Sequence, residues 1–218
     1  MKGNIWESIR RNKVVRNFII SDLALFGGWG LISPIMSIFV IEKVDGATLI
    51  TVGAAATIYW TVRSLVELPM AFIIEKTKSE KDDMYVLISG ILLVAVSALW
   101  LGFVDTVPEL FAFYVVHALG FGLYASAWSG IFSRHLDKSK ASSSWAMDHT
   151  VLGIATGITG LVGGYFAQRF GFNIIFLLAA ATSFIAAVFI FIVPDMILPG
   201  KKTGSAVIMD HSPRSTTK

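Results

Sequence analysis

FNIIFLLAAATSFIAAVFIFIV, residues 172–193, is a run of 22 residues without a charged side chain. At about 1.5 Å per residue, a helix of this length crosses a hydrocarbon core of about 30 Å. Five further apolar runs precede it, so that we place six spans at residues 17–41, 48–74, 84–104, 110–132, 145–168 and 172–193. Because a backbone in lipid must satisfy its own hydrogen bonds, and the runs lack strand alternation, the sequence predicts an all-α, polytopic membrane protein.

Lysine and arginine indicate which side of the membrane each connection faces. Of the 18 basic residues, 15 fall before the first span, in residues 75–83, in residues 133–140 or after Pro199. The opposite loops hold only Lys43 and Arg169. By the positive-inside rule both termini face the cytoplasm, and we expect a multi-pass protein of the cytoplasmic (inner) membrane.

Composition excludes several other classes of protein. The net charge of +3 reflects membrane orientation, and no stretch interleaves aromatic and basic residues as a nucleic-acid groove would. The chain has no cysteine and four scattered histidines, so we expect no metal site, and no motif calls for a cofactor. Residues 1–16 form a basic leader, either an interfacial helix or a solvated tail, and residues 200–218 have the composition of a disordered cytoplasmic tail.

The two halves of the chain resemble each other. GWGL at residues 28–31 is echoed by GFGL at residues 120–123, and IF at residues 38–39 by IF at residues 131–132. Three spans make up each copy, residues 17–104 and 105–199, and since three is odd the second copy crosses the membrane in the reverse sense. Inverted repeats of this kind are common in secondary transporters, with substrate sites where the repeats meet. The third and sixth spans carry no charge, so we expect them to face lipid.

A glycine pattern points to a family. GxxxGxxGxxGG at residues 153–164, followed by QRFGF at residues 168–172, resembles the fifth span and following turn of the major facilitator superfamily. The resemblance covers roughly residues 18–194. Transporters of that superfamily have twelve spans in two six-helix halves, so the chain resembles one half. The resemblance implies alternating access and pairing with a second half, and the glycines of residues 153–164 offer a groove for the seam between halves.

The chain departs from the family pattern in two places. The loop after the family's second span usually reads Gly-x-x-x-Asp-Arg-x-Gly-Arg, whereas here Ala71 replaces the first glycine, Glu75 and Lys76 replace the acid and the base, and Lys78 replaces the second glycine. The arginine often found in the family's fourth span is absent here. Val116 and His117 lie at the nearest positions.

Arg63 lies near the middle of the second span, where an unpaired cation costs at least a few kcal/mol. It must therefore face protein, water or an anion. Glu67 follows one turn later on the same face. The pair is either a structural ion pair, or Arg63 binds an anionic group of the substrate while Glu67 exchanges a proton. The planar guanidinium suits a carboxylate or a phosphate.

Asp22 is the second candidate for proton coupling. It lies in the first span, where similar members of the superfamily place a coupling acid, and Pro34 further along allows a kink. Burial disfavours the charged form of a carboxyl group, so a membrane-embedded acid can load and unload protons near neutral pH. The structural alternative is a cap, or a side chain that reaches the cytoplasmic surface.

His117 and three aromatic residues complete the predicted substrate site. His117 titrates in the useful range and is either a hydrogen-bond partner of the substrate or a packing residue. Trp60, Tyr124 and Trp128 can line a cavity, although such rings also serve in packing and anchoring belts.

Three residues are candidates for gating. Glu75 and Lys76 end the second span, and Asp148 begins the fifth, where it can stay hydrated as a helix cap. The resemblance implies that Glu75 meets the start of the partner's fifth span near Asp148.

Other functions fit less well. AWSG at residues 127–130 superficially resembles the nucleophile turn of intramembrane serine proteases, but the sixth span lacks a histidine base. No filter-like segment indicates a channel. We therefore expect not an enzyme but a secondary active transporter of a small, anionic solute, coupled to protons and acting in lipid as a homodimer or with another six-helix half. The alternatives are a non-transporting subunit or regulatory partner of another half-transporter, and a piece of a longer transporter.

Overall fold

The computed structural model describes residues 13–76, 79–136 and 141–193. These residues form seven helices: α2 (Lys13–Ile32), α3 (Met36–Lys43), α4 (Leu49–Lys76), α5 (Glu80–Leu101), α6 (Val107–His135), α7 (Ala141–Phe170) and α8 (Phe172–Ile192). All except α3 are long and apolar enough to cross a membrane, which confirms the six predicted spans. The predicted interfacial helix falls almost wholly, and the predicted tail entirely, outside the described residues.

The first predicted span is interrupted in the structure. α2 ends at Ile32, α3 begins at Met36, and Pro34 lies in the turn between them. Proline has no N–H group, so the carbonyl of Gly30, four residues earlier, loses its helical donor. The predicted first span, residues 17–41, therefore consists of two helices, and the kink allowed for at Pro34 is confirmed. α2 also includes residues 13–16, which the sequence predicts as part of the leader.

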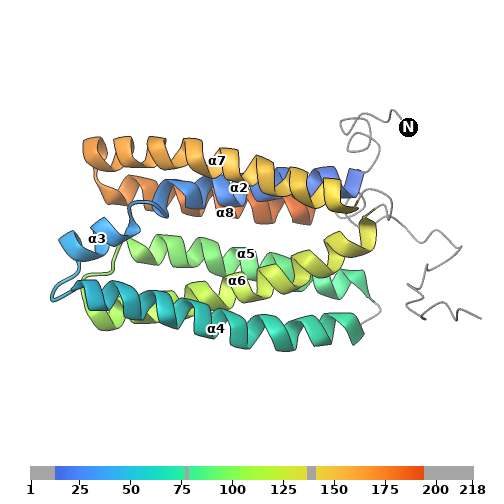
Figure 1. The fold of residues 1–218 in the computed structure, drawn as a ribbon, viewed down its shortest axis with the longest axis horizontal. Coiled ribbons are helices and arrows are strands. Elements are labelled where there is room, and N and C mark those ends of the chain that lie inside the picture. Colours follow the sequence, from blue (N-terminus) through green and yellow to red (C-terminus); the bar gives the residue numbers. More distant parts are fainter. Residues whose placement is uncertain (1–12, 77–78, 137–140, 194–218) are drawn as a thin grey trace, which may run out of the picture.

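The helices form two groups of three. In one group, α2 packs against α7 and α8. In the other, α6 packs against α4 and α5. The two groups are joined by the contact between α5 and α8. Figure 1 shows α7, α2 and α8 in one layer and α4, α5 and α6 in the other. Each group combines helices from both predicted repeats. The inverted repeat itself remains a prediction.

The helix ends alternate between the two ends of the bundle (Figure 1). At one end, the backbone N–H of Asp45 donates to the carbonyl of Asp105 at 2.8 Å, which ties the connection after α3 to the connection after α5. At the same end, Gly171 has φ of 84°, a conformation that favours glycine, and makes the turn from α7 into α8. The beginning of α2 and the end of α8 lie together at the other end. The start of the first span and the end of the last span are thus on one side of the bundle, as the basic residues predict. That this side faces the cytoplasm stays a prediction.

The span helices differ widely in burial. In their most apolar windows, 50% of α5 and 44% of α8 is buried, against 11% of α4 and 6% of α7. Burial within one chain does not distinguish contact with lipid from contact with a second six-helix unit, so the lipid-facing position of the third and sixth spans stays a prediction. α5 and α8 pack against each other between the two groups, whereas α4 and α7 lie at the outside.

Glycines allow close contact between helices at two places. A Cβ atom on Gly90 of α5 would lie 2.6 Å from the backbone nitrogen of Tyr124 on α6, closer than atoms can approach. On α7, Gly163 lies directly against the backbone of Leu31 on α2, and Gly160 lies against Pro34. Three other glycines of α7 have no neighbouring side chain or helix within 4 Å: Gly153, Gly157 and Gly164. Part of the predicted glycine groove is thus used inside the chain, and part remains open.

Candidate functional site

Arg63 is held by residues of its own helix, one turn away on either side. Its Nε lies 3.2 Å from Oε2 of Glu67, and its Nη1 donates to the hydroxyl of Tyr59 at 3.0 Å. The guanidinium carbon also lies 5.3 Å from the ring centre of Trp60 and 5.9 Å from that of Phe121 on α6, within range of cation–π attraction. The predicted ion pair between Arg63 and Glu67 is confirmed. The side chains are 23% and 43% exposed, so neither is sealed in the protein.

His117 lies buried on α6 among aromatic rings. Its ring centre is 4.1 Å from that of Trp29 and 5.4 Å from that of Tyr59, the residue that binds Arg63. Its Nδ1 is 3.1 Å from Oγ of Ser97 on α5, and the same hydroxyl lies 2.8 Å from the carbonyl of Val94. Since the single hydroxyl hydrogen of Ser97 is donated to that carbonyl, His117 must donate from Nδ1, which leaves Nε2 as an acceptor.

Asp22 lies in the core, 1% exposed, on α2. The hydroxyl of Tyr124 donates to its Oδ1 at 2.6 Å, and the indole of Trp128 approaches the same carboxyl group. The other oxygen, Oδ2, is buried and makes no hydrogen bond. The prediction of an acid inside the first span is confirmed, and the alternative of a side chain that reaches the surface is wrong.

Asp148 is placed differently from the sequence prediction of a hydrated cap. It lies seven residues beyond the start of α7 and is only 2% exposed, because α7 packs against α2 along this stretch. Its Oδ1 is buried without a hydrogen bond. The residue is close enough to Asp22 for the two carboxyl groups to interact electrostatically. A role for Asp148 as an exposed gate is therefore at odds with its burial.

The predicted residues thus fall into two neighbouring groups. The arginine group consists of Arg63, Tyr59, Trp60, Glu67 and His117, and the aspartate group consists of Asp22, Tyr124, Trp128 and Asp148. Phe121 and Tyr124 on α6 connect them, with ring centres 6.0 Å apart. Trp60 is 60% exposed at the edge of the first group, whereas Tyr124 and Trp128 are buried. Of the predicted gating residues, Glu75 and Lys76 are exposed at the end of α4.

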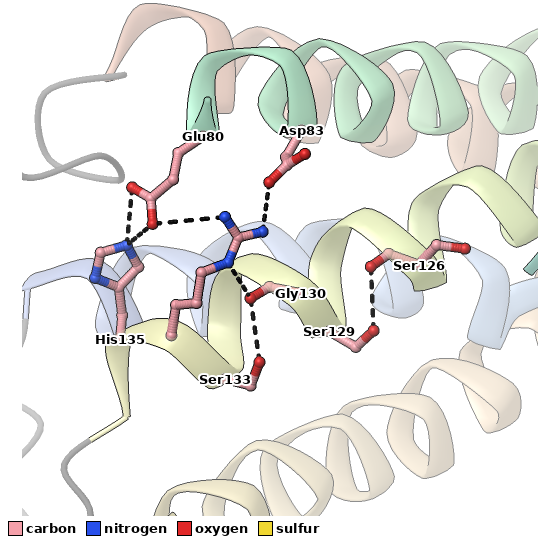
Figure 2. A network of polar contacts seen from close by, with 8 residues as sticks. Glu80, Asp83, Ser126, Ser129, Gly130, Ser133 and His135 are labelled. Carbon is pink, nitrogen blue, oxygen red and sulfur yellow. Dashed lines mark hydrogen bonds and ion pairs between the residues drawn. The ribbon is translucent and has the colours of Figure 1, made fainter. Parts of the chain in front are cut away.

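A polar network at the same end of the bundle is missing from the sequence prediction. Figure 2 shows Glu80 and Asp83, at the start of α5, facing the end of α6. Arg134 pairs with the buried carboxylate of Asp83 and lies 3.9 Å from Glu80, while Nε2 of His135 lies 3.2 Å from Glu80. These charges appear in the sequence only as members of basic and acidic loop clusters. These ion pairs hold the start of α5 against the end of α6.

The serine of the protease-like turn has a structural role. Oγ of Ser129 donates to the backbone carbonyl of Ser126 at 3.2 Å (Figure 2). Within residues 13–76, 79–136 and 141–193, no cluster of three metal-binding side chains occurs.

A pocket of about 860 Å³ opens at the end of the bundle that carries α3 and the α7–α8 turn. Its lining mixes apolar residues with the polar side chains of Glu42, Lys43, Asp105, Gln168 and Asn173. None of the predicted site residues lines it. The pocket therefore lies apart from both groups.

Six membrane-spanning helices with two groups of ionisable residues between them agree with the family resemblance found in the sequence. The sequence matches the family model of the Major Facilitator Superfamily over residues 18–212. The chain belongs to the Major Facilitator Superfamily. No curated protein matches the sequence.

Membership of the Major Facilitator Superfamily makes the chain a multi-pass membrane transport protein. Proteins of this superfamily are in general transporters rather than enzymes. The matched residues include the first span from residue 18 onward and the other five spans entirely, and they include the glycine pattern and the QRFGF turn that carry the resemblance.

Proposed function

We propose that this member of the superfamily is a secondary active transporter that moves a small, anionic solute by alternating access, with proton coupling. One observation carries the proposal: a partly exposed Arg63 in the middle of a membrane-spanning helix, beside an acid and aromatic rings. A cation at this depth is costly, and such residues mark substrate and ion pathways in membrane proteins.

The contacts of Arg63 suit exchange with a substrate. Its ion pair with Glu67 lies partly open to the surroundings, so an incoming carboxylate or phosphate can take the place of Glu67. Tyr59 and Trp60 hold the guanidinium in place from the same helix. Across from them, Nε2 of His117 offers a hydrogen-bond acceptor to a donor group of the solute.

Proton coupling follows from the same exchange. Glu67 loses its partner when a solute anion binds Arg63, and protonation then removes the cost of an unpaired carboxylate in the membrane. Asp22 supplies a second acid, buried at the contact of α2 with α6. Protonation of either acid changes the charge inside the bundle and thereby favours one of two states.

Alternating access requires a second six-helix unit, and a second copy of the chain is the simplest one. α4 and α7 leave most of their apolar surface uncovered in a single chain. Exposed residues along them include Leu65, Leu68, Ile154 and Ile158. In a homodimer related by an axis along the membrane normal, α4 of one copy meets α7 of the other, and the arginine groups face the space between the copies.

Uptake into proteoliposomes tests the proposal. Radiolabelled carboxylates and phosphate esters are offered to the purified protein, with and without a pH gradient. We expect Arg63→Ala and Glu67→Gln to abolish uptake of the transported solute while membrane insertion stays intact. Lys81→Ala, which removes an exposed cation at the start of α5, is the matched control and should transport normally. Normal uptake by both site variants would show that this group is not the substrate site.

Family membership favours transport over the alternative of a non-transporting subunit. If no solute in the panel is taken up by the unmodified protein, co-expression with other six-helix proteins becomes the next test.

A further inference from the structure

The aspartate group contains two buried acids on neighbouring helices. Asp22 on α2 and Asp148 on α7 are 1% and 2% exposed, and the two helices pack along each other. The carboxyl groups are within electrostatic range of one another. Among the residues that the structure describes, no lysine or arginine forms an ion pair with either. Two carboxylates this deeply buried cannot both stay charged at low cost.

Each acid also has an oxygen atom without a partner. Oδ2 of Asp22 and Oδ1 of Asp148 are buried and make no hydrogen bond. The hydroxyl of Ser21, next to Asp22, is buried in the same condition. Buried polar atoms without a partner cost about 1–3 kcal/mol each, and native proteins keep few of them unless a water, an ion or a proton completes the site.

The surrounding groups are arranged unequally around the two acids. From α6, Tyr124 donates a hydrogen bond to Asp22, and the indole of Trp128, more than nine-tenths buried and otherwise without a partner, is directed at the same carboxyl. From α7, the exposed His149 is the titratable neighbour of Asp148. α8, the third helix against α2, has no titratable side chain. The donors on α6 thus act on Asp22 alone, because Asp148 has no comparable donor.

We propose that Asp22 and Asp148 form one site for a single exchangeable monovalent cation, a proton or a sodium ion, that bridges α2 and α7. The inference rests on the proposed function in that this cation is the coupling ion. In the protonated form, one carboxylate oxygen takes a proton from a hydronium ion and leaves water, and the pair then shares one negative charge. When the cation leaves, the two carboxylates repel each other across the contact between α2 and α7.

In this proposal Asp148 binds the cation and is not a gating residue. α7 is the least covered span and, in the proposed dimer, lies at the partner copy. A cation held between α2 and α7 therefore links occupancy of the aspartate group to the position of the helix nearest the second unit. Loss of the cation weakens that link, so that the bundle changes state.

Infrared difference spectroscopy on the purified protein tests the proposal without any transported solute. The carbonyl band of protonated carboxyl groups is followed against pH for the unmodified protein, Asp22→Asn, Asp148→Asn and the double variant. Because removing one charge removes the repulsion, each single variant should release the proton of its remaining acid at a lower pH than the pair does. The double variant should lose the part of the band that Asp22 and Asp148 contribute, while the part from the other carboxyl groups of the chain remains. Asp82→Asn, an exposed acid of α5, should leave the titration unchanged.

A comparison of sodium chloride with choline chloride, at equal ionic strength, shows whether the bound cation is a proton or a sodium ion. If sodium binds, the band weakens at fixed pH only with sodium, and if the cation is a proton, the two salts act alike while pH still controls the band. Unchanged titration of the remaining acid in both single variants would show two independent acids and overturn the proposal. So would the absence of both a titrating band and a sodium effect in the unmodified protein, a result that does not depend on how the variants fold. Normal uptake by both Arg63→Ala and Glu67→Gln, together with a normal infrared result, would instead refute the proposed substrate site alone.

Discussion

The hydroxyl of Tyr124 on α6 donates a 2.6 Å hydrogen bond to Oδ1 of Asp22 on α2, between residues 102 positions apart in the sequence. α2 and α6 belong to different three-helix groups, and they touch over a small area. The bond is therefore one of few polar links between the groups. It also leaves Oδ2 as the oxygen of Asp22 without a hydrogen bond.

Tyr124→Phe removes this bond and keeps the ring. Since a hydrogen bond contributes about 0.5–1.5 kcal/mol between neutral groups and about 1.5–3 kcal/mol when one partner is charged, we expect a loss of stability of about 0.5–3 kcal/mol and a fall in melting temperature in detergent. Tyr114→Phe, on the same helix and half-buried, provides the control, because no hydrogen bond of the Tyr114 hydroxyl is seen in the structure. Equal melting temperatures for Tyr124→Phe and the unmodified protein would mean that the bond adds nothing to folding.

Gly90 sets the distance between α5 and α6. A methyl group there would lie 2.6 Å from the nitrogen of Tyr124 and 2.8 Å from the carbonyl of Gly120, so Gly90→Ala must push the helices apart. Overpacking of this kind costs about 1–3 kcal/mol. Gly27→Ala is the matched control, because nothing lies within 4 Å of its Cβ position and alanine favours a helix. Thermal unfolding should separate the two variants, and a Gly90→Ala protein as stable as Gly27→Ala would contradict the close packing.

Arg134 neutralises Asp83, whose side chain is only 2% exposed. Breaking a buried ion pair costs about 3–5 kcal/mol, and because Arg134 is 34% exposed we expect Arg134→Gln to fall at or below the lower end of that range. Unfolding measured by intrinsic tryptophan fluorescence gives the value. Asp82→Asn, which changes an exposed neighbour, should stay within about 0.5 kcal/mol of the unmodified protein. A loss for Arg134→Gln no larger than for Asp82→Asn would show that this ion pair is only a surface feature.

The chain has no cysteine, so engineered disulfides report contacts between copies without background. Leu65 on α4 and Ile154 on α7 are 70% and 60% exposed at similar depths in the bundle. If α4 of one copy meets α7 of the other, the Leu65→Cys, Ile154→Cys double variant should form a covalent dimer on oxidation in membranes. Each single variant, and Phe184→Cys on the exposed face of α8, should stay monomeric on denaturing gels. A monomeric double variant would exclude this homodimer.

The features that could be predicted from the sequence are those that depend on neighbouring residues. Runs of apolar residues predict the six spans, because a bilayer imposes a minimum length on each of them. The four-residue spacing of Arg63 and Glu67 predicts their ion pair, because such residues lie on one face of a helix. The break at Pro34 follows from the missing N–H group of proline.

The contacts that could not be predicted join residues far apart in the chain. Ser97 and His117 are 20 positions apart, and Arg134 and Asp83 are 51 apart, so their meeting depends on how α5 and α6 pack. Asp148 is buried for a similar reason: helix-start position predicts hydration, but α2 covers the residue. The high exposure of α4 and α7 likewise results from the packing order of the helices, to which hydrophobicity alone is a poor guide.

The break at Pro34 divides the first membrane crossing into two segments with different attachments. The ring of Phe39 on α3 packs 4.9 Å from that of Phe176 on α8, which anchors the short segment, while the long segment α2 carries Asp22. An unbroken rod would transfer any tilt at Asp22 along its whole length. With the break, α2 and α3 can tilt separately, so movement around the acid need not be carried to the opposite end of the bundle.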